Sequence, residues 1–172
     1  MGMSVACGVV ANGATAWCYG NSGGEPSMRG GDYLDDLRRL VARHGRDGIH
    51  GLISSVRHVA LFDEPCIRDY QLYGRHSDPD VNDGKGWYAL LRSLHGDMGG
   101  QLELGVLLAA ELAPSPNFAY LADLDQDTYL GYWNFHPGHD EPGEGNTLFR
   151  MPLARLTGRK FRRRFPRNPN WL

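Results

Sequence analysis

The most reactive combination of side chains in this chain is the segment His136-Pro137-Gly138-His139-Asp140-Glu141. Two imidazoles beside two carboxylates could supply acid–base chemistry or ligands for zinc or another transition metal. Pro137 and Gly138, however, predict a turn rather than a helix that would place both histidines on one face. We therefore favour a solvated polar loop, keep His136 and His139 as candidate ligand-binding residues, and predict no metal, no cofactor and no catalytic residue.

A second candidate site is the glycine-rich segment from Gly20 to Gly31, which precedes a predicted helix. Backbone N–H groups in such a loop can bind an anion. The glycine spacing matches neither the P-loop nor the dinucleotide-binding pattern, so a plain connecting loop is the alternative. The side chains that could donate hydrogen bonds to a small ligand here are those of Tyr19, Asn21, Ser22 and Arg29.

The third candidate is a basic region near the C-terminus. The formal net charge is −2, yet residues 150–172 hold eight Lys or Arg residues and no acidic one, which leaves −10 for residues 1–149. Arginines neutralise phosphates while interleaved phenylalanines stack on unpaired bases. The same residues could dock on an acidic protein surface, including this protein's own, or form a solvated end. The candidate partner- or nucleic-acid-binding residues are Arg159, Lys160, Arg162, Arg163, Arg164 and Arg167.

Two other patterns favour a structural role. The three cysteines, Cys7, Cys18 and Cys66, lack metal-type spacing and a nucleophile signature, so we expect each to be buried, in a reducing compartment. The alternating carboxylates of residues 123–127 are similar to a calcium loop, but Thr128 and Asn134 stand where an EF-hand needs Gly and Glu. A hairpin turn is the better interpretation.

Hydrophobic spacing and turn residues predict the elements that position these side chains. Asn12-Gly13 joins two strands into a hairpin, and a polar turn joins two more at residues 118–135. We also expect helices at 32–44, 87–94 and 101–112, and short strands at 49–54, 58–62 and 67–73. This pattern predicts an α+β fold: a mostly antiparallel sheet built from hairpins, with two or three helices packed on one face. The expected organisation is a single domain over residues 1–149 and a basic C-terminal tail over residues 150–172.

The composition excludes several classes of protein. Apolar residues make up 41% and charged residues 22%, which is ordinary for a globular domain. No stretch approaches the ~20 apolar residues of a membrane span. The first residues lack the basic region and apolar run of a secretory signal. We therefore expect a cytoplasmic protein without membrane contact, and homo-oligomers stay open.

Two stretches resemble a group of small uncharacterised proteins of bacteriophages, prophages and other mobile elements. The first is the N-terminal hairpin followed by Tyr19-Gly20-Asn21-Ser22-Gly23-Gly24-Glu25-Pro26 and a helix. The second is the hairpin from Phe118 to Tyr129, with the helix before it. Residues 21 and 22 are Asn and Ser where the group usually carries a Gln-Trp pair. The resemblance implies a genomic setting, and it implies no established activity.

These observations favour a phage or mobile-element accessory protein that binds a host partner or ligand, for example as a counter-defence inhibitor. One alternative is a sponge that sequesters a small nucleotide messenger. Another is a metal- or His-dependent hydrolase or transferase acting on a nucleotide or amide. The weak catalytic patterns favour a protein that is not an enzyme. The expected partner is a host protein or a small nucleotide, with nucleic acid at the basic region as a further alternative.

Overall fold

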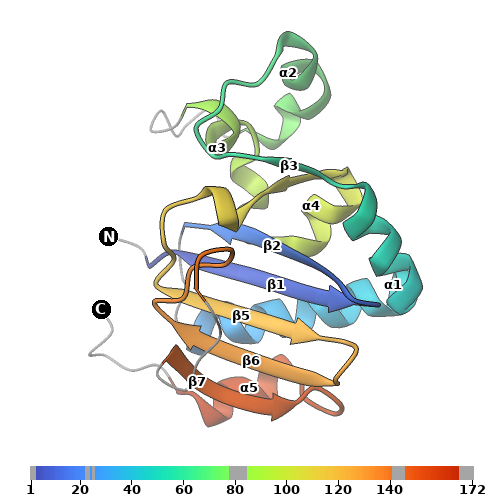
Figure 1. Ribbon diagram of the computed structural model, residues 1–172, viewed down its shortest axis with the longest axis vertical. Helices are drawn as coiled ribbons and strands as arrows, with labels where there is room; N and C mark the ends of the chain where they lie inside the picture. Colours follow the sequence, from blue (N-terminus) through green and yellow to red (C-terminus); the bar gives the residue numbers. More distant parts are fainter. Residues whose placement is uncertain (1–2, 22–23, 25, 78–84, 141–145, 167–172) are drawn as a thin grey trace.

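The computed structural model describes residues 3–21, 24, 26–77, 85–140 and 146–166. Its centre is a five-stranded sheet in the order β2-β1-β5-β6-β7 (Figure 1). Strands β1 and β5 are parallel, and the other neighbours are antiparallel. The strands are β1 (Val5–Ala11), β2 (Ala14–Gly20), β5 (Phe118–Asp123), β6 (Thr128–Trp133) and β7 (Thr147–Pro152). The predicted α+β class with a mostly antiparallel sheet is confirmed.

Both predicted hairpins form, and their turns are joined to each other. Asn12 and Gly13 have φ angles of 47° and 75°, the left-handed geometry that a tight two-residue turn requires. The carboxylate of Asp125, in the β5–β6 turn, accepts hydrogen bonds of 2.8 Å from the backbone N–H groups of both residues. The acidic run at 123–127 is therefore a hairpin turn, as expected, and it ties the two hairpins together at one end of the sheet.

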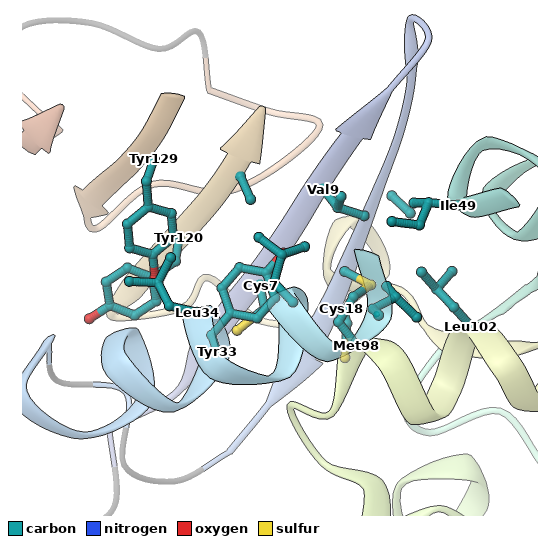
Figure 2. Packing of buried hydrophobic residues seen from close by; sticks show 14 of the residues in the cluster. Cys7, Val9, Cys18, Tyr33, Leu34, Ile49, Met98, Leu102, Tyr120 and Tyr129 are labelled. Atoms are coloured by element: carbon teal, nitrogen blue, oxygen red, sulfur yellow. The ribbon is translucent and has the colours of Figure 1, made fainter. Parts of the chain in front are cut away.

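Three helices cover one face of the sheet: α1 (Gly31–Ser55), α4 (Met98–Leu104) and α5 (Gly158–Arg164). Helices α1 and α5 lie behind the sheet in Figure 1. Figure 2 shows Tyr33 and Leu34 of α1 packed over the sheet beside Cys7, and all three side chains are essentially inaccessible to solvent. Burial of this apolar face is the main force that holds the helices on the sheet.

Three buried tyrosines in this core each donate a hydrogen bond to a glycine carbonyl. Tyr33 Oη donates to Gly8 O at 2.6 Å, across the helix–sheet interface. Tyr120 Oη and Tyr129 Oη donate to the carbonyls of Gly24 and Gly30, at 2.6 and 2.8 Å. The last two bonds fasten the glycine-rich segment, including the turn η1 (Pro26–Gly30), to the sheet.

The other face of the sheet packs against the chain around a second, two-stranded parallel sheet, β3 (Arg57–Val59) and β4 (Val106–Leu108). This small sheet lies beside β2, which an isolated bridge joins to Ala109. Helices α2 (Ile67–Tyr73) and α3 (Gly86–Leu90) extend beyond it in Figure 1. Short turns complete this region: η2 (Gly74–His76), η3 (Arg92–Leu94) and η4 (Ala110–Leu112).

Three segments differ most from the sequence-based expectation. Residues 49–54 are not a strand but the second half of α1, which resumes after Gly45 interrupts the helix with φ 63°. Residues 67–73 form α2 rather than a strand, because Cys66 and Asp69 make a capping box at its start. The predicted helix 101–112 divides at Gly105, whose φ of 80° ends α4 and lets the chain enter β4.

Residues 150–166 are built into the domain rather than extending from it. The expected boundary at residue 149 falls inside β7, and α5 packs on α1. Phe161 of α5 is fully buried, with ring centroids 5.1 Å from Phe149 and 5.5 Å from Tyr129. The described part of the C-terminal region therefore completes the core. No helix within the described ranges combines the length and the apolar character needed to cross a bilayer.

Candidate functional site

The end of strand β2 meets the turn that precedes α4. Gly96 N donates to Tyr19 O at 3.2 Å. A Cβ placed on Gly20 would lie 2.9 Å from the Gly96 Cα, so the two backbones touch. Only glycine fits this close approach. The contact brings Tyr19 and Asn21 of the glycine-rich region next to residues 88–96.

Tyr88, in α3, is the centre of the polar groups gathered here. Its hydroxyl oxygen accepts hydrogen bonds from Asn21 Nδ2 and from Arg92 Nη1, the latter at 2.6 Å. The Arg92 guanidinium carbon lies 5.3 Å from the centroid of the Tyr88 ring. The His95 ring lies 4.4 Å from the same ring, centroid to centroid. Each of these side chains is half-buried, so the cluster is partly shielded from water.

His95 is held in its neutral form. Its Nε2 hydrogen-bonds the Tyr88 carbonyl oxygen at 2.8 Å. The pKa of His95 is lowered from 6.5 to about 4, mainly by burial and in smaller part by the guanidinium groups of Arg92 and Arg29, while the hydrogen bond to Tyr88 opposes the shift. Both arginines therefore act on the same small region, and His95 adds no charge to it near neutral pH.

Arg29 brings a second cation to the cluster. A Cβ built on Gly96 would lie 3.3 Å from the Arg29 Cζ, so the guanidinium covers that glycine. Arg29 is half-buried, yet within the described ranges its side chain makes no hydrogen bond or ion pair. The nearby Asp36 pairs with Arg39, and Asp97 accepts the Gly100 N–H at 2.9 Å. A half-buried guanidinium of this kind has N–H donors that an anion could use.

We call this group the Tyr88 cluster; it consists of Tyr19, Asn21, Arg29, Tyr88, Arg92 and His95. Three of the four candidates that the sequence placed on the glycine-rich segment are brought together in it, and Ser22 lies outside the described residues. Sequence reasoning missed Tyr88, Arg92 and His95. The signal for two of them was present, because positions 88 and 92 are one helical turn apart on the predicted helix 87–94.

His136 and His139 lie in a separate loop. His136 is 8% exposed, its Nε2 bonds the Ala113 carbonyl oxygen at 2.9 Å, and its ring lies 4.4 Å from that of His139. The backbone N–H of His136 donates to Asp140 Oδ2 at 2.5 Å. These bonds anchor the loop to the sheet end. Among the described residues, the Nδ1 atom of His136 and the Oε2 atom of Glu111 are buried without a hydrogen-bond partner.

In the ranges that the structure describes, no three or more His, Cys, Asp or Glu side chains gather so as to hold a metal ion.

The basic residues of the C-terminal region divide into two groups. Arg162 donates to Asp32 at 2.9 Å and to Asp35 at 3.1 Å, so it binds an acidic surface of the protein's own helix α1. Exposed residues of α5 are Arg159, Lys160, Arg163 and Arg164, and Arg167 lies outside the described residues. The exposed four stay candidates for contacts with an acidic partner.

Two of the three cysteines are buried, as expected, and one is not. Burial raises the pKa of the Cys7 thiol to about 12 and raises that of Cys18 as well, so neither is a thiolate nucleophile near neutral pH. Cys66 is exposed at the N-cap of α2, where its side chain accepts from the backbone of Asp69. The expectation for Cys66 was wrong because its role is to cap a short surface helix.

Comparison of the chain with protein-family models, with curated protein sequences and with solved structures found no significant match. The resemblance to phage-encoded proteins therefore stays an expectation.

Proposed function

We propose that this protein is a binding protein, not an enzyme, and that it captures the phosphate of a small ligand in the Tyr88 cluster. The observation that carries this proposal is the half-buried guanidinium of Arg29, which has no hydrogen-bond or ion-pair partner among the described residues. Arg92 supplies a second guanidinium to the same cluster. Guanidinium groups bind phosphate and carboxylate oxygens through paired N–H donors.

The hydrogen bonds of Tyr88 support the same proposal. Its oxygen accepts from Asn21 and Arg92, which occupies both of its lone pairs. The phenolic proton is then left to donate, and within the described ranges no acceptor takes it. A ligand anion would supply that acceptor. Among the described residues the cluster presents N–H and O–H donors, and no carboxylate is hydrogen-bonded to Arg29, Tyr88 or Arg92.

The catalytic alternative has less support. His95 and His136 each use one ring nitrogen to bond a backbone carbonyl, and burial keeps the thiols of Cys7 and Cys18 protonated. A phosphate-binding cluster agrees better with an accessory protein that captures a ligand than with an enzyme. The sponge for a small nucleotide messenger and the counter-defence inhibitor are the forms of this proposal that the resemblance to phage proteins favours.

Isothermal titration calorimetry with inorganic pyrophosphate and with a panel of mono- and dinucleotides tests the proposal. We expect Arg29→Ala to weaken binding about tenfold or more, since a charge-assisted hydrogen bond to a half-buried anion contributes about 1.5–3 kcal/mol. Arg29→Lys keeps the charge but loses the paired N–H donors, so its affinity for the ligand should lie between those of Arg29→Ala and the parent protein.

The matched control is Arg43→Ala, which removes an exposed arginine of α1 that pairs with Glu103 at 3.3 Å, outside the cluster. This variant should bind every phosphate ligand as the parent protein does. Equal affinities for Arg29→Ala and the parent protein, with both proteins folded, would place the binding site elsewhere and overturn the proposal.

A further inference from the structure

A groove lies at the end of the sheet opposite the Tyr88 cluster. Its walls are helix α1 between residues 37 and 46, the β5–β6 turn, and the segment 153–155 that leads from β7 to α5. Its volume is about 450 Å³, within the range of small-molecule sites. The Arg38 Nη1 donates to Leu156 O at 2.8 Å and so joins the two long walls.

The floor of the groove is aliphatic. It is formed mainly by Leu37, Val41, Leu124 and Leu153, and none of the described residues that line it is aromatic. Val41 is 36% exposed although it belongs to the apolar stripe of α1. A floor of this kind favours an aliphatic chain over a planar base, because it offers methyl and methylene groups and no ring on which a base could stack.

The rim of the groove is cationic. Arg38, Arg46 and Arg155 line it together with one carboxylate, that of Asp127. Arg46 lies 3.9 Å from Asp125, at the outer limit of an ion pair. Within the described ranges the guanidinium of Arg155 has no hydrogen bond or ion pair. The excess of positive charge beside an apolar floor matches a ligand with one anionic end and one aliphatic end.

The backbone of Arg155 provides a second, independent indication. Its φ of 63° is in the left-handed region, which is unfavourable for a residue with a side chain. Lys160 Nζ donates to the Arg155 carbonyl at 3.1 Å, and Leu156 N closes a turn onto Leu153 O at 3.1 Å. Non-glycine residues held in this conformation cluster at ligand-binding positions.

We infer that this groove binds an aliphatic carboxylic acid in its anionic form. The chain lies along the floor between α1 and Leu153, and the carboxylate pairs with Arg155 and the neighbouring rim arginines. The site is separate from the Tyr88 cluster, and the inference does not depend on the function proposed for that cluster.

Calorimetric titration of the full-length protein with decanoate tests the inference, with decan-1-ol, acetate and a short oligoglutamate peptide as comparison ligands. We expect saturable binding of decanoate and much weaker binding of each other ligand, because decanol lacks the charge and acetate lacks the chain. Equal binding of decanol and decanoate, or binding of the peptide and not of decanoate, would overturn the inference.

Two variants locate the site. Arg155→Gly removes the guanidinium and suits the left-handed backbone, so the protein stays folded while decanoate affinity falls about fivefold or more. Val41→Glu places a carboxylate beside the rim arginines and should abolish binding. Ile67→Glu, on the exposed face of α2 where Ile67 is 80% exposed, and Arg43→Ala are the controls and should bind decanoate normally.

Pyrophosphate binding should be unchanged in Arg155→Gly and Val41→Glu, which separates failure of this inference from failure of the Tyr88 cluster. Decanoate affinity that is the same in Arg155→Gly, Val41→Glu and the parent protein would place the ligand elsewhere and overturn the inference.

Discussion

Substitution of Phe161 by alanine should destabilise the whole domain, although this residue lies only eleven positions from residue 172. Phe161 is 0% exposed, and its ring lies 4.8–5.5 Å from the rings of Phe165, Phe149 and Tyr129, centroid to centroid. A Cβ on Gly30 would lie 2.8 Å from the Phe161 ring, so the ring also packs on the segment that carries Arg29.

The expected loss is about 3–4 kcal/mol, the lower part of the range for Phe→Ala in a core, because the short helix α5 can partly relax into the cavity. For a domain of this size the melting temperature should fall by about 6–16 °C. Phe161→Leu keeps most of the volume and should cost about 1 kcal/mol. Thermal and urea unfolding followed by circular dichroism give both quantities.

The matched control is Phe62→Ala, because Phe62 is 69% exposed and its removal should change stability by no more than about 0.5 kcal/mol. If Phe161→Ala unfolds at the temperature of the parent protein, α5 does not belong to the core and the placement of the C-terminal region is wrong.

Three further predictions follow from single contacts. Arg162→Ala should lower the free energy of unfolding by less than about 1 kcal/mol, since its ion pairs with Asp32 and Asp35 are partly exposed to solvent. The difference should shrink when urea unfolding is measured in 1 M salt, and a loss above 2 kcal/mol would contradict this. The pKa of His95 is lowered from 6.5 to about 4 in the folded state, so the unfolded chain binds the proton more tightly. The free energy of unfolding should then fall by up to about 3 kcal/mol as pH drops from 6.5 to 4. In His95→Gln, urea unfolding across that range should show a smaller change of this free energy with pH. An identical pH dependence in the variant and the parent protein would contradict the lowered pKa of His95. Gly8→Ala should lower the free energy of unfolding by about 1–3 kcal/mol, because the new Cβ would lie 2.5 Å from the Trp17 ring. Gly51→Ala should stabilise α1 by about 0.5–1 kcal/mol, because no atom lies within 4 Å of the new Cβ. A higher melting temperature for Gly8→Ala than for Gly51→Ala in differential scanning calorimetry would contradict the packing described.

The hairpins could be predicted from the sequence because their signals are local. Asn12-Gly13 accepts the left-handed φ angles of a two-residue turn, and strands of alternating character flank it. The parallel pairing of β1 with β5 joins residues more than a hundred positions apart, and no short-range pattern encodes it. The fold class was therefore predictable, while the strand order was not.

The errors in the middle of the chain have a common physical cause. Residues 49–54 and 67–73 contain β-branched or aromatic residues at short spacing, which favours strands when each segment is considered alone. In the structure Ile49 and Ile53 lie one helical turn apart and both pack on the core, so tertiary burial of an α1 face decides their conformation. Around α2, the capping box at Cys66 and Asp69 is the stronger local signal.

The candidate site was predicted in part. The glycine-rich segment carried the polar residues, but their partners at positions 88–96 reach them only through the contact of Gly20 with Gly96. The basic region was expected to extend from the domain, because its many charged residues favour an exposed tail and only Phe161 and Phe165 indicate packing. Both rings pack against Phe149 of β7, and this contact exists only in the assembled fold.

Side-chain NMR of the arginine Nε–Hε groups can show directly whether an anion binds at Arg29 and Arg92. The ¹⁵N-labelled protein is titrated with pyrophosphate, with signals assigned from Arg29→Lys and Arg92→Lys. We expect saturable shifts of the Arg29 and Arg92 Nε–Hε signals and of the Gly96 amide signal, with the Arg43 signal unmoved. Saturable binding that leaves Arg29 and Arg92 unshifted, or the absence of any binding of pyrophosphate or nucleotides, would contradict the assignment of the Tyr88 cluster as an anion site.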